Sequence, residues 1–508
     1  MDIESIRPVL VLLVSLVGAV LILVFRKDPN VREGCSLTAA VLKCLLVVSM
    51  VPAVLAGKTY TFTVLTFLPG VSLSLRVDAL GLIFALTASA LWILNTIYSI
   101  GYMRAHHERK QTRFYTCFAL TLSATMGVAF SANLVTMYLF YEILTFVTYP
   151  LVAHNETKVA YTGANKYFFY LLGTSTAFLL PAIILTYSLS GNGDFNPAGI
   201  FPAETNALLL TFMFFLFLFG IGKAAVMPVH AWLPAAMVAP TPVSALLHAV
   251  AVVNTGVFCV LRVMFHVFGV DLMRALNLGV FVAGLASVTI LTASCIALTR
   301  NNLKERLAFS TISQLSYIVL GGALLTSSGM AGGVLHIANH AFAKITLFFC
   351  AGAIYVATNK TQISELDGIG RKMPWTMTAF AIGTLTMIGI PPSGGFVSKW
   401  YLAIGSVEAD KLVILFVLFS STLLNAAYFV PIVYRAFFKA PSGEEVHGVT
   451  HGLAFAAAGD KDGGGGSTQS TQEASYFIIV PLMMTAIISL ILGMFPDILL
   501  GLVRQVTG

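Results

Sequence analysis

The stretch GKAAVMPVHAWLPAAMVAPTPVSALLHAV, residues 222–250, decides how this chain folds. It follows the apolar run LLLTFMFFLFLFG, which ends at Gly220, and it contains one lysine, two histidines and four prolines. Such a run reaches the middle of a bilayer, where every backbone N–H and C=O group must be hydrogen-bonded within the protein. Prolines at that depth predict a broken helix that lines a polar cavity. Lys223 is then an internal ionic site; the alternative is a surface loop from which Lys223 snorkels to the interface.

The composition indicates a membrane protein and not a soluble globule. Of the 508 residues, 57% are hydrophobic and 10% are charged, whereas about a quarter of the residues of a soluble domain are charged. Apolar windows of about twenty residues predict roughly fourteen membrane-spanning helices. Their starts lie near residues 7, 36, 78, 113, 132, 162, 207, 242, 272, 303, 330, 375, 411 and 476. We therefore predict an all-α, polytopic membrane protein.

The basic residues mark the topology. The net charge of +7 is dispersed over short loops after the odd-numbered predicted spans, at Arg26, Lys27, Arg32, Arg104, Arg109, Lys110, Arg113, Lys158, Arg300, Lys304, Arg306, Arg371, Lys372, Arg435 and Lys439. Short loops rich in lysine and arginine stay in the cytoplasm. Both termini are therefore expected outside, in the periplasm if the host is a bacterium, with the chain in the inner membrane. This dispersal gives no reason to expect a nucleic-acid partner.

No cofactor site is evident in the sequence. The six cysteines are scattered singly, without a CxxC pair that would hold zinc or an iron–sulfur cluster. Neither a P-loop nor a Rossmann turn is present. We expect no cofactor, no metal and no redox or hydrolytic site of the chain's own, and the sequence leaves open whether the chain serves an enzyme complex.

The predicted fifth span, NLVTMYLFYEILTFVTYPLV, contains one carboxylate, Glu142. Placing a carboxylate in hydrocarbon costs roughly 2–3 kcal/mol, so Glu142 needs a partner or a wet cavity. Lys223 is the predicted partner. A buried lysine alone tends to lose its proton and a buried glutamate tends to gain one, while a close opposite charge reverses both tendencies. A pair that opens and closes is a proton switch; a static ion pair that fixes helix packing is the alternative.

A second polar segment, GVLHIANHAFAKITLFF, lies in the predicted eleventh span. Its residues His336, His340 and Lys344 recur every four positions, so they share one helical face, about 6 Å apart per turn. Such a ladder can pass protons through intervening water. A metal site is disfavoured because no Cys, Asp or Glu nearby completes the pair of histidines. His248, in the same interrupted segment as Lys223, is predicted to join this relay; a packing histidine is the alternative.

The run TMIGIPPSGGFVSKWYLA repeats the pattern of the first break. Pro391 and Pro392 interrupt an apolar helix, and Lys399 follows at membrane depth. Two broken helices five spans apart predict an internal repeat whose copies are inverted in the membrane. The predicted division is residues 1–105 for helices 1–3, 106–268 for the first five-helix repeat, 269–440 for the second, 441–475 for a Gly/Ser-rich linker, and 476–508 for helix 14.

Other polar residues within the spans have two interpretations each. Lys43 in the second span is expected to snorkel, with a lateral polar contact as the alternative. Asp78 is expected to begin the third span as a carboxylate favoured by the helix dipole. Ser310, Gln314 and their neighbours in the tenth span either support a water chain or hold helices together.

Five motifs, in order along the chain, carry a resemblance to a known family. They are the span with Glu142, segment 222–250, LAFSTISQLSYI at 307–318, HIANHAFAKITLFFCAGAI at 336–354 and GIPPSGGFVSKW at 389–400. These motifs resemble the antiporter-like proton-transporting subunits of respiratory complex I, membrane-bound hydrogenases and Mrp-type multisubunit sodium/proton antiporters. The match covers roughly residues 75–435. The chain looks most like the D-type antiporter subunit, since Lys399 stands where the M-type subunit has glutamate and the long lateral helix of the L-type does not follow the fourteenth span.

The resemblance implies a role for each residue. Glu142 and Lys223 would form the regulatory ion pair, and Lys399 would release or accept the proton at the end of the path. His248, His336, His340 and Lys344 would form the central polar axis. Many relatives have a lysine where this chain has Asn254, which is a departure from the family pattern within the relay.

The resemblance also implies partners. Expected partners are other membrane subunits of a multisubunit complex, including members of the same family and a small multi-spanning subunit; protons, and in some relatives sodium, would be the transported ions. Two alternatives come from other classes. One is a stand-alone secondary transporter of a small solute, which inverted repeats with broken helices also fit. The other is a structural scaffold subunit.

Overall fold

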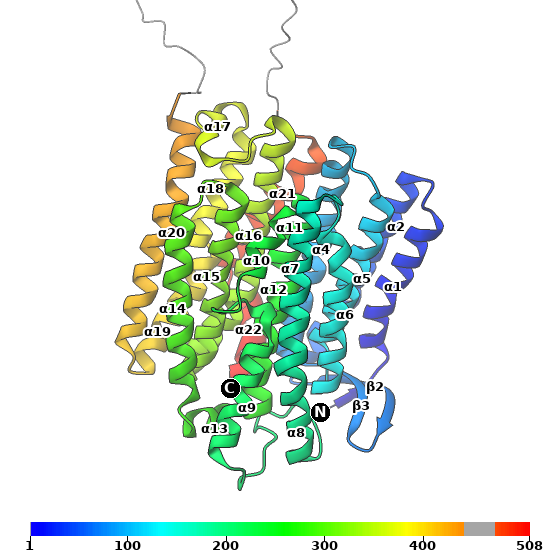
Figure 1. The fold of residues 1–508 in the computed structure, drawn as a ribbon, viewed down its shortest axis with the longest axis vertical. Helices are drawn as coiled ribbons and strands as arrows, with labels where there is room; N and C mark the ends of the chain where they lie inside the picture. Colours follow the sequence, from blue (N-terminus) through cyan, green and yellow to red (C-terminus); the bar gives the residue numbers. More distant parts are fainter. Residues whose placement is uncertain (1, 441–472, 508) are drawn as a thin grey trace, which may run out of the picture.

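The computed structural model describes residues 2–440 and 473–507 and shows a bundle of long, roughly aligned helices (Figure 1). Eleven helices in these residues are long and apolar enough to cross a membrane. The prediction of a polytopic helical membrane protein is therefore confirmed. The count of fourteen spans is not confirmed by this criterion: Ala207–Gly220, Pro374–Ile388 and Gly394–Glu408 are shorter than 18 residues, and Gln111–Ala129 is long enough but is not among the eleven. The predicted linker lies outside the described residues except for its last three.

The N-terminal part consists of α1 (Arg7–Val24), α2 (Pro29–Val48), the short α3 (Val51–Leu55) and α4 (Ala79–Ala105). α1 and α2 lie at one edge of the bundle, whereas α4 lies further in and is mostly buried (Figure 1). Asp28 caps α2 by accepting hydrogen bonds from the next turn's backbone N–H groups, and Pro29 occupies the first position, so α2 begins earlier than predicted.

The first predicted repeat contains an interrupted helix at its centre. Its elements are α5 (Gln111–Ala129), α6 (Leu134–Val152), α7 (Lys158–Thr174), η1 (Ser175–Leu179), α8 (Leu180–Ser190), α9 (Ala207–Gly220), η2 (Gly222–Ala224), α10 (Trp232–Ala235), η3 (Ala236–Val238), α11 (Thr241–Ala245), η4 (Leu246–Val250), α12 (Val252–Val263) and η5 (Met264–Phe268); the short α13 (Val270–Ala275) lies beyond the predicted end of this repeat at residue 268. The apolar helix α9 stops at Gly220, and single turns replace it through residue 238. The first predicted break is confirmed.

The second predicted repeat contains the other break. Its elements are α14 (Leu278–Thr299), α15 (Leu303–Leu324), α16 (Ser327–Thr358), η6 (Ile363–Glu365), α17 (Ile369–Lys372), α18 (Pro374–Ile388), α19 (Gly394–Glu408) and α20 (Leu412–Phe438). Five residues with two prolines separate α18 from α19, as predicted. The boundaries of the two repeats and their inverted relation remain predictions.

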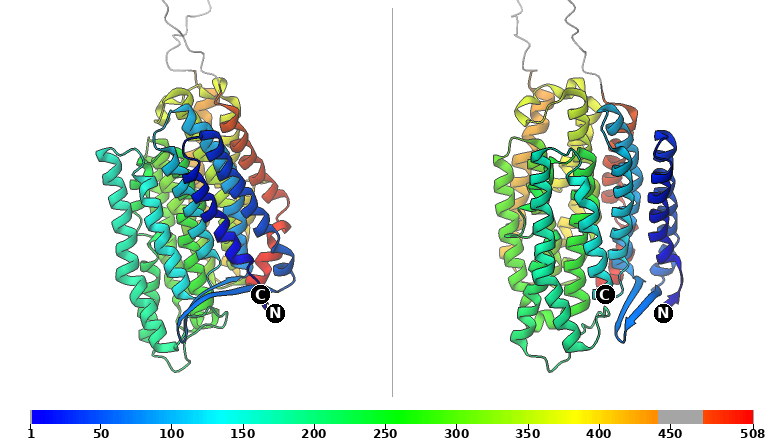
Figure 2. Two further views of the ribbon diagram at one scale, coloured as in Figure 1. Left: turned by 90° about the vertical axis from the view of Figure 1, so that its right-hand side faces the viewer. Right: turned by 45° about the vertical axis from the view of Figure 1, so that its right-hand side comes forward.

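The expectation of an all-α chain is wrong in one place. A small sheet of β1 (Asp2–Glu4), β2 (Thr59–Leu68) and β3 (Val71–Val77) lies below the N-terminal helices (Figure 2). β1 pairs in parallel with β2, and β2 pairs antiparallel with β3. The sequence signal is a pair of runs rich in β-branched and aromatic residues on either side of Pro69 and Gly70, a turn dipeptide.

The C-terminal segment is two helices and not one. α21 (Tyr476–Met494) ends before Pro496, and α22 (Asp497–Thr507) is a separate amphipathic helix. Pro496 disfavours the helical conformation at the preceding residue, Phe495, whose φ and ψ angles of −127° and 64° end α21.

The two ends of the bundle differ in chemistry. At one end, which we call the basic end, Arg32 donates hydrogen bonds to Gln111 (2.7 Å) and Thr112 (3.2 Å) and joins the starts of α2 and α5. Both termini and the sheet lie at the opposite end, which we call the sheet end (Figure 1). The loops after α1 and α4, which carry predicted cytoplasmic charges, therefore share the end opposite the termini.

The expectation that Lys43 snorkels is wrong. Lys43 is fully buried, and its Nζ atom donates to the carbonyl oxygen of Leu122 on α5 at 2.9 Å. It also lies 4.7 Å from the centre of the Trp92 ring on α4. The buried face of α2 directs this side chain inward, which hydropathy alone does not reveal.

Candidate functional site

Lys223 lies at the first helix break, on η2, with its side chain fully buried. Its Nζ atom donates to the Thr145 hydroxyl at 2.6 Å and to the Tyr141 carbonyl at 2.9 Å, and it lies over the Tyr141 ring. Its backbone N–H donates to the Tyr141 hydroxyl. α6 therefore supplies every contact that holds this ammonium group in the described residues.

Gly256 on α12 permits the close packing at this break. A Cβ atom there would lie 2.2 Å from the backbone of Lys223 and Ala224. Only glycine allows two backbones to approach so closely. The packing of η2 between α6 and α12 thus fixes the lysine at one depth.

Glu142 follows Tyr141 on α6, yet it does not form the predicted ion pair with Lys223. Both Glu142 carboxylate oxygens are buried and have no hydrogen-bond partner among the described residues. Lys223 instead takes Thr145, which lies three residues from Glu142 on the same helix. The direct contact predicted from the sequence is therefore absent in this structure, because backbone and hydroxyl oxygens already solvate the lysine.

His248 lies on η4, a wide helical turn between α11 and α12. Its ring stacks on Phe348 of α16 at 5.6 Å, and both ring nitrogens are buried without a partner in the described chain. Asn254, two residues before Gly256, connects this turn to the region of Lys223. Its side-chain amide donates a hydrogen bond to the carbonyl of Ala249 at 2.8 Å. Asn254 therefore stabilises the wide turn.

The three predicted ladder residues lie on α16, as expected, and are buried. Lys344 donates to the Ser310 hydroxyl at 2.5 Å and to the Leu307 carbonyl at 3.3 Å. The rings of His336 and His340 are stacked 6.0 Å apart. His340 has no partner on either nitrogen among the described residues. The ladder faces α15, the helix that contributes Ser310.

His336 is held from two sides. Its Nδ1 atom lies 2.7 Å from the Ser398 hydroxyl on α19, and its Nε2 atom lies 2.9 Å from Gln314 Oε1 on α15. Because the Gln314 oxygen can only accept, Nε2 carries the proton when His336 is neutral, and Ser398 donates to Nδ1. The Gln314 amide on α15 and the Ser398 hydroxyl on α19 thus orient the imidazole of His336.

Lys399 lies on α19, just beyond the second break. Its Nζ atom donates to the carbonyls of Met387 and Ile388 at 2.9 Å each. These carbonyls end the half-helix α18, where the helix dipole is negative. The side chain is half-buried, and the neighbouring Trp400 is exposed on the edge of the bundle.

Tyr317 is a site residue that sequence reasoning missed. Its ring centre lies 5.6 Å from the His336 ring and 5.0 Å from Lys399 Nζ, so Tyr317 contacts both groups. Its hydroxyl is buried without a partner in the described part. Thr145 and Ser398 were missed as well; the only sequence signal is that each is a polar residue within four positions of a predicted site residue.

Charged residues also gather outside this axis. Asp78 caps α4 by accepting from Gly81 N at 2.9 Å, as its predicted place at the helix start implies, and it forms a buried ion pair with Arg262 on α12. Burial acts to raise the pKa of Asp78, but the Arg262 guanidinium outweighs burial and holds that pKa below its usual range. This pair fastens α4 to α12 at the sheet end.

The loop after α6 carries another group at the basic end. Burial, together with the charge of Arg113, lowers the pKa of His154 from its usual 6.5 to about 4. Hydrogen bonds from Lys110 and Arg113 hold the pKa of partly exposed Glu156 below its usual range. The described residues contain no group of three His, Cys, Asp or Glu side chains able to bind a metal ion.

Comparisons with known proteins agree with this geometry. A family model described as NADH:quinone oxidoreductase/Mrp antiporter, TM, matches residues 131–425, and one described as NADH-ubiquinone oxidoreductase (complex I), chain 5 N-terminus, matches residues 69–115. Subunit N of the NADH-quinone oxidoreductase of Desulforudis audaxviator is 31% identical over 442 residues, which is 85% of this chain and 86% of that protein.

Longer relatives match over part of their length. Subunit L of the Mycobacterium tuberculosis enzyme is 33% identical over 346 residues, 66% of this chain and 53% of that protein. Chain 5 of the NAD(P)H-quinone oxidoreductase of Picosynechococcus is 31% identical, over 82% of this chain and 63% of that protein. The chain thus spans about half to two thirds of these longer proteins.

Two solved structures share the fold across almost the whole chain. They are a chain of the Mrp complex from a Dietzia species and a chain of an archaeal membrane-bound sulfane sulfur reductase. Each gives a TM-score of 0.85 at 22% identity, and they cover 99% of this chain and 96% and 97% of the respective structures. The chain belongs to the NADH:quinone oxidoreductase/Mrp antiporter family of membrane subunits.

Proposed function

We propose that this chain moves protons through the membrane along its buried titratable side chains, as one subunit of a multisubunit complex. The observation that carries the proposal is the placement of six ionisable groups within the bundle, where η4 and α19 pack on α16, and α12 packs on both η4 and η2: Lys223, His248, His340, His336, Lys344 and Lys399. Ionisable residues inside a membrane are costly and mark proton or ion pathways. Their spread through both halves fits a relay better than a single solute pocket.

Lys223 is the switch in this proposal. Its ammonium group is held by Thr145 and Tyr141, while the carboxylate of Glu142, the residue after Tyr141, has no partner among the described residues. Movement of the ammonium toward Glu142 would stabilise its proton, and return to the Thr145 position would loosen it, because an opposite charge favours the charged form of lysine. The ion pair predicted from the sequence is thus one of two positions of the lysine.

The second half provides the exit or uptake group. His336 contacts Tyr317, and Tyr317 contacts Lys399 at the edge of the bundle. Lys399 is half-buried beside exposed Trp400 at the edge of the bundle, so it is placed to exchange a proton with a neighbouring subunit. We expect the neighbour to be a membrane subunit, as in the Mrp complex that shares this fold.

The proposed orientation follows the positive-inside rule. We infer that the basic end faces the cytoplasm and that both termini lie outside, in the inner membrane of a bacterium. Cysteine substitutions at exposed His107 and Lys58 test this by labelling with a membrane-impermeant maleimide. Labelling of the position-58 cysteine from outside and of the position-107 cysteine only after permeabilisation supports the orientation; the reverse pattern excludes it.

The test of function compares Lys399→Ala with the wild-type chain in vesicles that contain the assembled complex. We expect normal assembly and loss of proton transport, measured with a pH-sensitive dye. Unchanged transport would favour the scaffold alternative. Full proton exchange by the chain reconstituted alone would favour the stand-alone transporter and contradict the multisubunit proposal.

A further inference from the structure

Lys43 is a buried cation that the central axis does not use. It lies on α2 between α4 and α5, at the N-terminal edge of the bundle. Trp92, which it contacts, is the central residue of α4, with 13 residues on each side. Lys43 therefore lies near the middle of the membrane, like Lys223, but on a different set of helices.

The contacts of Lys43 are few for an ammonium group. Of its three N–H donors, one meets the Leu122 carbonyl, and the Trp92 ring lies on the other side. No carboxylate of the described residues forms an ion pair with it, in contrast to the buried guanidinium of Arg262, which pairs with Asp78. A charge buried with so little compensation costs several kcal/mol, unlike one in a complete ion pair.

A polar stripe leads from Lys43 to the basic end. On the buried face of α2, Ala39 and Ala40 separate Lys43 from Ser36, which lies about 10 Å away at 1.5 Å per residue, and Glu33 follows about 15 Å from Lys43. The Ser36 hydroxyl, the Trp92 indole N–H and the Tyr115 hydroxyl are all buried without a partner in the described chain. Toward the sheet end the same face of α2 continues with apolar Val47 and Met50. On α2 itself, the buried polar residues therefore lie only on the basic-end side of Lys43.

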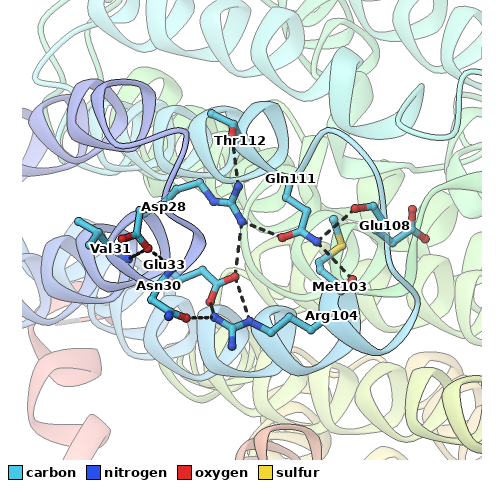
Figure 3. Close-up of polar contacts among 10 residues, drawn as sticks. Asp28, Asn30, Val31, Glu33, Met103, Arg104, Glu108, Gln111 and Thr112 are labelled. Carbon is cyan, nitrogen blue, oxygen red and sulfur yellow. Dashed lines mark hydrogen bonds and ion pairs between the residues drawn. The ribbon is translucent and has the colours of Figure 1, made fainter.

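The mouth of the stripe is a charged network (Figure 3). Glu33 accepts from Arg104 of α4, at the level where Arg32 reaches Gln111 and Thr112 of α5. Arg32 also lies 5.4 Å from the ring centre of Tyr115, whose hydroxyl belongs to the stripe. Glu33 is buried, while the Arg104 side chain is half exposed, so the network connects solvent with the interior.

We propose that Lys43 is a second membrane-depth proton-binding site, which exchanges its proton with the basic end along the stripe of Ser36 and Tyr115 and not with the central axis. In the exchange an N–H bond of the ammonium breaks, an O–H bond forms on water, and the electron pair of the N–H bond stays on Nζ. The charged and titratable groups that face this path are Cys44, Arg32 and Glu33 on α2, Arg104 on α4 and Tyr115 on α5; α1 contributes only Arg7, at the sheet end.

The stripe favours a proton site over a mere helix fastener. A fastener needs a carbonyl and a fixed charge, and it does not account for the unpartnered polar atoms of Ser36, Trp92 and Tyr115 on α2, α4 and α5. Buried polar groups without protein partners are commonly bridged by water. Groups bridged in this way are what a proton needs to reach an amine at this depth.

The test asks whether transport needs an amine at position 43 that gains and loses a proton, or only a fixed positive charge there. Lys43→Met removes the amine at similar volume, and Lys43→Arg keeps a charge that cannot be titrated. Both are compared with Lys58→Met, an exposed control, in vesicles that contain the whole complex. We expect normal assembly and, for both Lys43 variants, a fall in the pH of half-maximal transport at the basic face by about one unit, a tenfold change in proton concentration.

Three results would overturn the proposal. A wild-type pH profile for Lys43→Arg would mean that a fixed charge suffices. A wild-type profile for Lys43→Met would mean that the amine has no part in transport, and failure of both variants to assemble would assign Lys43 to packing. Ser36→Ala checks the route, since it leaves Lys43 in place and is expected to shift the profile in the same direction; no shift would exclude the stripe as the path. The outcome is independent of Lys399→Ala, which tests the main axis.

Discussion

Lys223 and Lys399 follow the two broken helices of one chain, but the structure holds them differently. Lys223 is fully buried and depends on a hydroxyl and a carbonyl of a neighbouring helix, α6. Lys399 is half-buried and depends on two carbonyls at the end of its own preceding half-helix, α18. One partner of Lys223 is a side-chain hydroxyl, which can rotate away. Both partners of Lys399 are backbone carbonyls, and they lie beside an exposed edge of the bundle. We infer a switch in the first half and a terminal group in the second.

The two breaks share one packing device. Gly256 allows α12 to touch the backbone of η2, and Gly395 allows α19 to approach α18, where an added Cβ atom would lie 1.8 Å from the Thr386 carbonyl oxygen. Each lysine is thus placed by a glycine that permits contact between backbones. The difference between the lysines therefore lies in their acceptors and not in how the breaks are packed.

Removal of the switch is expected to have the largest effect. Lys223→Ala should lower proton transport by at least about 100-fold, the scale on which a positioned acid–base group contributes, while the complex still assembles. Dye-monitored proton uptake in vesicles measures this, with Lys58→Ala as an exposed control. Transport within twofold of the control would show that the first break is not part of the path.

The acceptors themselves can be compared. Thr145→Val removes the hydroxyl that holds Lys223 and should slow transport about tenfold, as expected for a lost hydrogen bond to a charged group. Met387→Ala should have little effect, because the backbone carbonyl that holds Lys399 is retained. Equal losses in the two variants would contradict the distinction between a side-chain switch and a backbone site.

The next largest effect is expected on stability, when the close packing at the second break is disturbed. Gly395→Ala should destabilise the chain by about 1–3 kcal/mol through overpacking, seen as a lower midpoint of thermal unfolding of the purified complex. Gly173→Ala on α7 is the control, since nothing lies within 4 Å of an added Cβ there. An unchanged midpoint for Gly395→Ala would mean that α19 is free to move away from α18.

The smallest effect is expected for His154, in the loop after α6, and it concerns how stability depends on pH. The folded chain keeps the pKa of His154 near 4, whereas an unfolded histidine titrates near 6.5. Between these values the unfolded state binds more protons, so stability falls as pH falls from 6.5 toward 4. His154→Gln should remove about 1–3 kcal/mol of that pH dependence, measured by thermal unfolding at pH 7 and pH 5; exposed His107→Gln should not.

The sequence determined the class of protein, both helix breaks and the one-face ladder of α16, because apolar length, prolines and a four-residue period are local properties. It could not reveal that Lys223 donates a hydrogen bond to Thr145 instead of pairing with Glu142. It also could not reveal that Tyr317 contacts both His336 and Lys399, or that the Lys43 side chain is buried. Those facts depend on which faces of distant helices meet. Hydropathy says that a segment enters the membrane, but only tertiary packing decides which oxygen atoms surround each buried charge.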